Sequence, residues 1–278
     1  MVGSCLLNQL ALSGRGVIAF SRQSEPEHKG DIEWRKIASY SHSNIIETIP
    51  NWICLAPIWV LPDYFQLLEN SSVKRIVVLS STSIFTKMDS LDLADQALAR
   101  KLMDSEAQLE SWAESKGIEW VVVRPTLVYG LGLDKYITEI MRFILRWGFF
   151  PILGTGQGLR QPVRVEDVAK ACKAVIDSPT CENGAYNLSG SEILSYRDML
   201  TRVFVSMDRK PRLIHFPRWF FQFMLLGLRL LPVFRKWSIG MVDRMSRDMT
   251  FDHTDFETAF KLSPQPFVLS EKDLPKER

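Results

Sequence analysis

Short runs of hydrophobic residues alternate with longer amphipathic segments along the first half of the chain. The runs at 75–79 and 119–123 are continuously apolar after their first residues, Arg75 and Glu119, which is typical of strands buried on both faces of a parallel sheet. Shorter runs at 17–20 and 52–56 also have the composition of strands. Because such runs alternate with segments of helical spacing, the pattern predicts βαβ units and an α/β fold.

Helices are predicted from spacing and from the residues at their ends. The segment 93–116 has helical spacing and is followed by Gly117, a residue type that commonly ends helices. A second helix is predicted at 166–177. Capping boxes that begin at Ser195 and Thr254 predict two further helix starts, so the second half of the chain is the more helical one.

The composition is that of an ordinary globular protein, with 46% hydrophobic and 24% charged residues among 278. A net charge of +2 gives no electrostatic reason to expect nucleic-acid binding. The cysteines and histidines are scattered and form no Cys-x-x-Cys pair, so we expect no metal site. No signal peptide is evident, and we predict a cytoplasmic protein with a sheet-rich domain over 1–150 and a smaller, helix-rich lobe over 151–278.

The most apolar stretch, Trp219–Pro232, is too short for a bilayer span of about 20 residues, and Arg229 interrupts it. The plainest interpretation is a helix buried against the rest of the protein. The alternatives are an interfacial helix on a membrane surface and a helix that docks in the groove of a partner protein.

Residues 2–22 are predicted to form a helix, a glycine stop and a strand. In a dinucleotide-binding fold, Gly3 would be the last glycine of the turn that approaches the pyrophosphate. Arg22 follows the strand, where an NADP-preferring protein holds the 2′-phosphate and an NAD-preferring protein carries an acidic residue. An ordinary N-terminal turn and an exposed loop charge are the alternatives. We therefore predict NADP in preference to NAD.

Five segments of the chain together carry a resemblance to a known family, and they occur in that family's order. They are 2–4 with Arg22, 79–85, 123–130, 160–169 and 184–190. With them the chain resembles the NAD-dependent epimerase/dehydratase family, the extended or atypical branch of the short-chain dehydrogenase/reductase superfamily. The resemblance implies a doubly wound, Rossmann-like parallel sheet with the NAD(P) cofactor across the carboxyl ends of the strands. A smaller, helix-rich C-terminal lobe would close over the substrate.

The resemblance also implies roles for particular residues. Ser81 matches the serine or threonine that hydrogen-bonds the reacting hydroxyl or carbonyl, and Lys101 is the candidate for the catalytic lysine. Arg160 matches an arginine that contacts the diphosphate of sugar-nucleotide substrates, a task that suits a bidentate guanidinium. Further substrate contacts are expected from Thr82 and Ser83. The expected cofactor-binding residues are Gly3, Arg22, Ala56, Pro57, Ser80 and Pro125.

The predicted helix at 93–116 departs from the family's catalytic pattern. Hydride chemistry in the family needs a tyrosine four residues before a lysine, with the phenol as acid and base. If Lys101 is that lysine, Ala97 takes the tyrosine position. If Glu106 is the acidic residue that often lies four beyond the lysine, Leu98 and Leu102 take the two positions. Neither alignment supplies a phenol.

The family's first strand is also missing. It would lie at the centre of the sheet, between the strands at 17–20 and 52–56, and its absence would leave two edges with unpaired backbone groups. We therefore expect the natural start of the chain to lie upstream of Met1.

Three functions are compatible with these observations. The first is an NAD(P)-dependent epimerase, dehydratase or reductase that acts on a nucleotide sugar or similar polar ligand, with Tyr64, Tyr129 or Tyr136 as conceivable substitutes for the missing tyrosine. The second is a non-catalytic NAD(P)-binding module that serves in assembly or regulation. The third is a non-binding paralogue or a truncated gene product. The sequence assigns no oligomeric state.

Overall fold

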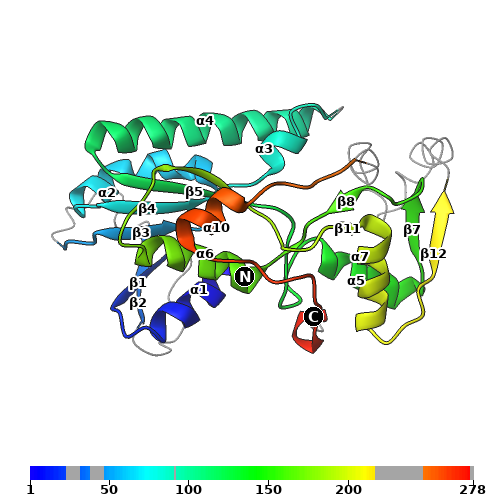
Figure 1. Ribbon diagram of the computed structural model, residues 1–278. Coiled ribbons are helices and arrows are strands. Elements are labelled where there is room, and N and C mark those ends of the chain that lie inside the picture. Colours follow the sequence, from blue (N-terminus) through cyan, green and yellow to red (C-terminus); the bar gives the residue numbers. More distant parts are fainter. Residues whose placement is uncertain (23–31, 38–46, 91, 217–246, 276–278) are drawn as a thin grey trace.

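A parallel sheet of four strands, in the order β10-β5-β4-β3, forms the centre of the molecule in the computed structural model (Figure 1). The structure describes residues 1–22, 32–37, 47–90, 92–216 and 247–275. The strands of this sheet are β3 (Asn51–Cys54), β4 (Arg75–Leu79), β5 (Glu119–Pro125) and β10 (Gly184–Leu188). The strands predicted at 52–56, 75–79 and 119–123 are therefore confirmed, and the fold is the predicted Rossmann-like α/β arrangement.

Helices cover both faces of this sheet and complete a three-layer structure (Figure 1). One face is covered by η2 (Ile58–Tyr64), α2 (Phe65–Asn70) and α4 (Leu93–Lys116). The other is covered by α1 (Val2–Ala11), α6 (Val165–Asp177) and α10 (Thr254–Phe260). In β5, Val121 and Val123 pack on the second face and Val122 packs on the first, all without exposed surface. This two-sided burial explains the continuous apolar run in the sequence.

The strand predicted at 17–20 is β1 (Val17–Ser21), and it pairs in parallel with β2 (Ile32–Lys36) in a separate two-stranded sheet. In the described part of the chain, no backbone hydrogen bond joins this pair to the four-stranded sheet. The two sheets meet instead through side chains, because the rings of Phe20 in β1 and Trp52 in β3 stack with centroids 5.1 Å apart.

A further apolar cluster lies between α5 (Ile137–Trp147) and α7 (Tyr196–Ser206). Figure 1 shows these two helices to the side of the sheet. Short strands complete this region: β6 (Val128–Tyr129), β7 (Phe150–Leu153), β8 (Leu159–Arg160), β9 (Val163–Arg164), β11 (Leu194–Ser195) and β12 (Leu213–Phe216), with α3 (Ser83–Thr86) and η3 (Glu271–Asp273) elsewhere. The division of the chain at residue 150 stays a prediction. Three elements from beyond residue 150 belong to the sheet-rich half of the structure: β10 is a strand of the four-stranded sheet, and α6 and α10 pack against that sheet.

The predicted helix ends are largely confirmed. Asp92 caps α4 by accepting from the Ala94 N–H, and Gly117 ends the helix with a left-handed φ of 63°. Ser195 caps α7 by accepting from the Asp198 N–H. The capping box predicted at Thr254 is wrong: the N-cap is His253, and the Thr254 hydroxyl donates to Asp252 at 2.6 Å because Asp252 lies just outside the helix.

The segment Trp219–Pro232 lies outside the described residues. Within the described ranges, no helix has the length and apolar character needed to cross a membrane.

Arg75 joins the sheet to the end of α6. Its guanidinium is 8% exposed, pairs with Glu119 at 2.6 Å and donates to the carbonyls of Val175 and Ser178 at 3.0 and 2.6 Å. The last carbonyls of a helix have no partner within the helix, so this side chain satisfies groups that would otherwise be buried and unpaired.

We expect Arg75→Met to lower the free energy of unfolding by about 2–4 kcal/mol, because it removes the cap and leaves Glu119 unpaired. Urea denaturation measures this change. The matched control is Arg15→Met, which breaks the exposed pair with Asp177 and should cost less than about 1 kcal/mol. Equal losses in the two variants would contradict the capping role of Arg75.

Burial also makes two thiols poor nucleophiles. It raises the pKa of the Cys54 thiol to about 11 and that of Cys172 to about 12, from an ordinary value of 9.0. At about pH 8 we expect Cys54 in the folded chain to react with iodoacetamide about 100-fold more slowly than in the urea-unfolded chain, since only the thiolate reacts. A comparable rate in both states, measured by mass spectrometry, would contradict this.

The raised pKa of Cys54 also predicts that the free energy of unfolding falls as the pH rises from about 9 to about 11, because the unfolded chain ionises the Cys54 thiol before the folded chain does.

Candidate functional site

The carboxyl ends of β3, β4, β5 and β10 lie at one edge of the sheet, because the four strands are parallel. The chain leaves this edge at Ala56 and Pro57 after β3, at Ser80 after β4 and at Pro125 in β5. Ligands of open α/β sheets bind outside this edge. The fold therefore brings these four sequence-predicted cofactor residues to a common edge.

The turn after β4 carries four consecutive hydroxyl side chains with different surroundings. Thr82 is buried and donates to the Pro125 carbonyl at 3.3 Å, which ties the turn to β5. Ser80 donates its hydroxyl proton to Glu106. Ser81 and Ser83 are half-buried, with their hydroxyl oxygens 2.9 Å apart. Among the residues that the structure describes, the hydroxyls of Ser81 and Ser83 bond only to each other and to the Ser83 N–H of their own turn.

A buried ion pair stands behind this turn. Glu106 in α4 accepts from Nε of Arg124 in β5 at 3.0 and 3.2 Å and also from the terminal guanidinium nitrogen. The two side chains are 8% and 19% exposed. Since Ser80 bonds to the same carboxylate, α4, β4 and β5 are held together at one point. Sequence reasoning used Glu106 only to align the helix and gave Arg124 no role, although it stands in one of the segments that carry the family resemblance.

The ion pair fixes which face of α4 looks toward the turn. Leu102 and Leu98 lie one and two turns before Glu106, and both pack in the apolar cluster with Ile58 and Ile84. Lys101 is displaced about 140° around the helix from Glu106, at about 100° per residue. Its side chain is exposed, with Nζ 4.7 Å from the centre of the Trp59 ring. Of the two sequence alignments, the one based on Glu106 thus places two leucines in this apolar cluster at the family's tyrosine and lysine positions.

The three tyrosines considered as substitutes do not compensate in this structure. The Tyr129 hydroxyl donates to the Val268 carbonyl at 3.3 Å and accepts from the Val268 N–H at 3.2 Å. Burial raises the pKa of this phenol. Tyr136 packs against the cluster between α5 and α7, and Tyr64 ends η2. Within the described residues, no hydrogen bond joins any of these phenols to Ser81.

The N-terminus of α1 lies beside the turn that follows β3. A Cβ built on Gly3 would meet a methyl carbon of Leu55 at 3.5 Å, an ordinary contact, so packing does not demand glycine here. The first turn of α1 contains no acidic residue and no side-chain cap, which leaves its N–H groups available to an anion. Arg22 follows β1 and is exposed. These features fit the phosphates of a dinucleotide.

Arg160 occupies a buried position at the side of this site. It is 2% exposed, donates to the carbonyls of Leu159 and Arg247 at 2.7 and 2.8 Å, and lies 5.3 Å from the centre of the Tyr196 ring. Its contacts connect β8 to the segment that enters α10.

That segment contains contacts that the sequence did not suggest. Ser189, at the end of β10, donates to the Phe251 carbonyl at 2.8 Å and lies 2.6 Å from Nδ1 of His253. The Phe251 N–H donates to the side chain of Gln161 at 2.7 Å. A cavity of about 250 Å³ lies between this segment and α3. The described residues that line it are Phe85, Thr86, Arg247, Asp248, Met249, Thr250 and Phe251.

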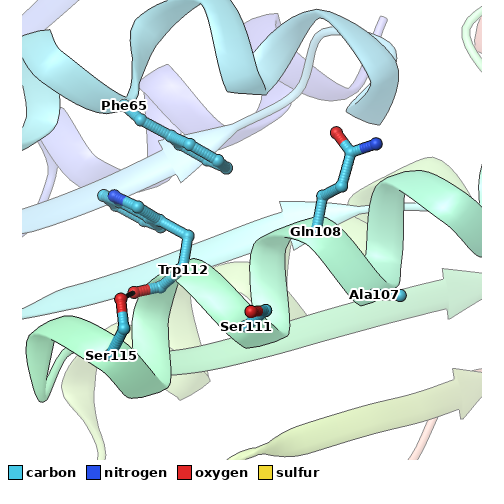
Figure 2. A pocket seen from close by; sticks show the side chains of 6 residues that line it. All are labelled: Phe65, Ala107, Gln108, Ser111, Trp112 and Ser115. Atoms are coloured by element: carbon cyan, nitrogen blue, oxygen red, sulfur yellow. Dashed lines mark hydrogen bonds between the residues drawn. The ribbon is translucent and has the colours of Figure 1, made fainter.

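A second hollow, of about 450 Å³, lies on the outer side of α4 beyond Glu106. Figure 2 shows the flat stack of Phe65 and Trp112 at one side of it, with ring centroids 4.1 Å apart, and the small side chains of Ala107 and Ser111 beside them. The Trp112 indole N–H donates to Glu69 at 2.8 Å. None of the sequence-predicted site residues lines this hollow.

Comparisons with known proteins agree with this architecture. Residues 64–189 match the profile of the NAD dependent epimerase/dehydratase family. UDP-glucose 4-epimerase of Vibrio cholerae is 24% identical over 194 residues, which cover 66% of this chain and 56% of that protein. The mitochondrial NADH dehydrogenase [ubiquinone] 1 alpha subcomplex subunit 9 of Arabidopsis thaliana is 26% identical over 150 residues, 54% of this chain and 35% of that protein. The chain thus spans between about a third and just over half of the length of these curated relatives.

Solved structures match over nearly the whole chain. UDP-glucuronic acid 4-epimerase from Bacillus cereus, in complex with NAD, superposes with a TM-score of 0.72 at 15% identity, covering 98% of this chain and 92% of that one. UDP-glucose 4-epimerase from Thermotoga maritima, with UDP-glucose, gives a TM-score of 0.70 at 14% identity and the same coverage. At these identities the structures establish the fold. The matched profile, over residues 64–189, and the segment order in the sequence both make the chain similar to the NAD-dependent epimerase/dehydratase family.

Proposed function

We propose that this chain binds NAD(P) along the carboxyl edge of its sheet and a nucleotide-sugar-like ligand beside it, without the tyrosine-dependent hydride transfer of that family. Relatives of the same fold are described in complex with NAD and with UDP-glucose. In this chain the N–H groups at the start of α1, near Gly3, would hold the pyrophosphate. Ala56, Pro57, Ser80 and Pro125 would border the rest of the cofactor.

The observation that carries the proposal is the face of α4. When bound, the cofactor supplies hydride transfer, but that reaction needs a group that moves a proton at the reacting oxygen. The two family positions before Glu106, the residue of α4 that bonds to Ser80, are held by Leu98 and Leu102, which pack in the apolar cluster with Ile84 of α3. A positioned acid or base contributes about 10²–10⁴-fold to rate, so its loss leaves binding as the main remaining capacity.

Two further observations favour a role in assembly or regulation over metabolism. One relative is named as a subunit of a larger complex, the NADH dehydrogenase of Arabidopsis thaliana. Lys101, the remaining candidate of the catalytic pair, rests against Trp59 on the exposed side of α4. Catalysis by Ser81 and Lys101 with an unconventional acid is the competing function.

Titration with NADPH and NADH, followed by thermal unfolding, tests the cofactor. At 100 times the dissociation constant a ligand adds about 2.7 kcal/mol of stability. We expect Arg22→Ala to weaken NADPH about tenfold and to leave NADH unchanged, because the guanidinium would pair with the 2′-phosphate. Arg209→Ala, which removes an exposed arginine elsewhere, is the control. No shift with either dinucleotide would refute the binding proposal, and equal shifts in all variants would refute the NADP preference.

Incubation with UDP-glucose and either dinucleotide tests whether the chain lacks hydride transfer. We expect neither a C4 epimer by proton NMR nor a change in nicotinamide absorbance above the rate of a blank without protein. Turnover that is abolished by Ser81→Ala and by Lys101→Met, but retained in Arg100→Met, would overturn this part and establish the enzyme. Arg100 is the matched control because it is the neighbouring exposed cation on α4.

A further inference from the structure

The ring of Phe85 is exposed yet held firmly in place. It belongs to α3, the short helix that continues directly from the serine turn, and it is 47% exposed. The Arg124 guanidinium lies 5.3 Å from its centroid, and the Phe251 ring lies 5.8 Å away at a tilt of 31°. An exposed ring that a cation and a second ring hold in position presents a preformed aromatic face to a ligand.

The partner ring is fixed equally well. Both backbone polar groups of Phe251 are bonded by side chains, its N–H to Gln161 and its carbonyl to Ser189, and Ser189 in turn contacts His253. Gln161 is 7% exposed and Ser189 is fully buried. The two phenylalanines therefore form one wall built from both sides of the site: Phe85 from α3, and Phe251 from the segment that enters α10.

This aromatic wall borders the cavity of about 250 Å³, whose other described lining residues are polar or charged apart from Met249. Thr86 and Thr250 bring hydroxyl groups, which donate and accept hydrogen bonds, and Asp248 brings a carboxylate. Pockets that enclose drug-sized ligands measure about 300–1,000 Å³, so this cavity suits a single ring rather than a whole nucleotide.

We propose that the Phe85–Phe251 wall is the subsite for the sugar ring of the ligand, and that Phe85 determines specificity for a glycosylated over a free nucleoside diphosphate. A pyranose has an apolar face of C–H groups, which suits the negative face of an aromatic ring, and a rim of hydroxyls, which suits Thr86, Thr250 and Asp248. The Arg124–Glu106 pair, which also holds Ser80, keeps the wall next to the serine turn. This inference rests on the proposed binding of a nucleotide sugar.

The test compares the affinities of UDP-glucose and UDP by isothermal titration calorimetry on the full chain. We expect the wild-type chain to bind UDP-glucose more tightly than UDP. Phe85→Leu should weaken UDP-glucose about fivefold and UDP less than twofold, since an aromatic contact is worth about 0.5–1.5 kcal/mol. Phe85→Tyr keeps the ring and should keep the affinity for UDP-glucose. Trp147→Leu is the matched control, because Trp147 is 48% exposed with the Arg146 guanidinium 5.3 Å from its ring.

Each other outcome rejects the subsite. If the wild-type chain binds UDP and UDP-glucose equally, the sugar subsite is wrong while the proposed binding function stands. If Phe85→Leu weakens both ligands equally, Phe85 contacts the base or supports the fold, and the specificity role is wrong. If the wild-type chain binds neither ligand, the proposed function fails and the subsite with it. Circular dichroism of Phe85→Leu separates a lost contact from a lost fold.

Discussion

The buried ion pair between Glu106 and Arg124 is the constraint on which the site depends. It links a helix to a central strand, and through Ser80 it also reaches the next strand. Removing one member of a buried pair leaves a charge without a partner, at a cost of about 3–5 kcal/mol, so the two side chains hold each other in place. The carboxyl ends of β4 and β5 and the middle of α4 therefore behave as one rigid corner. On the outer side of that corner, Arg124 also supports the ring of Phe85.

This corner decides the chemistry by fixing the rotation of α4. A helix turns about 100° per residue, so once Glu106 points inward, the residues four and eight positions earlier lie about 40° and 80° from it around the helix, on the side that packs over the sheet. In this chain those residues are Leu98 and Leu102, which join the apolar cluster over the sheet. Apolar side chains add stability there but move no proton. The same rotation carries Lys101 outward to Trp59. The loop backbones and α3, which would bind the ligands, do not depend on which side chains α4 carries at these positions. Binding and catalysis can therefore separate in such a fold.

The polar surface of the site comes from segments that are far apart in the sequence. The serine turn follows β4, and the segment 247–251 returns to the same place just before α10. Side chains fix this return: Gln161 and Ser189 hold the backbone of Phe251, and Asp248 accepts from the Leu159 N–H at 2.9 Å. The cavity between these segments therefore has one wall from the sheet edge and one from the returning chain, and both walls are anchored by buried polar groups.

The sequence by itself determined the sheet strands, the long helix and the edge at which ligands meet the fold. The apolar runs of β4 and β5 and the cap and stop of α4 are local signals, because burial on both faces and helix capping each leave a pattern within a few residues. The helix α10 does begin at Thr254, but its N-cap was placed one residue too late, because the Thr254 hydroxyl bonds to Asp252 and not to the helix. Only the tertiary structure decided the rotation of α4, the burial of Arg160 and the meeting of Phe85 with Phe251. Each of these depends on contacts between residues more than fifteen positions apart, and neither spacing nor composition records which distant partner a side chain will find.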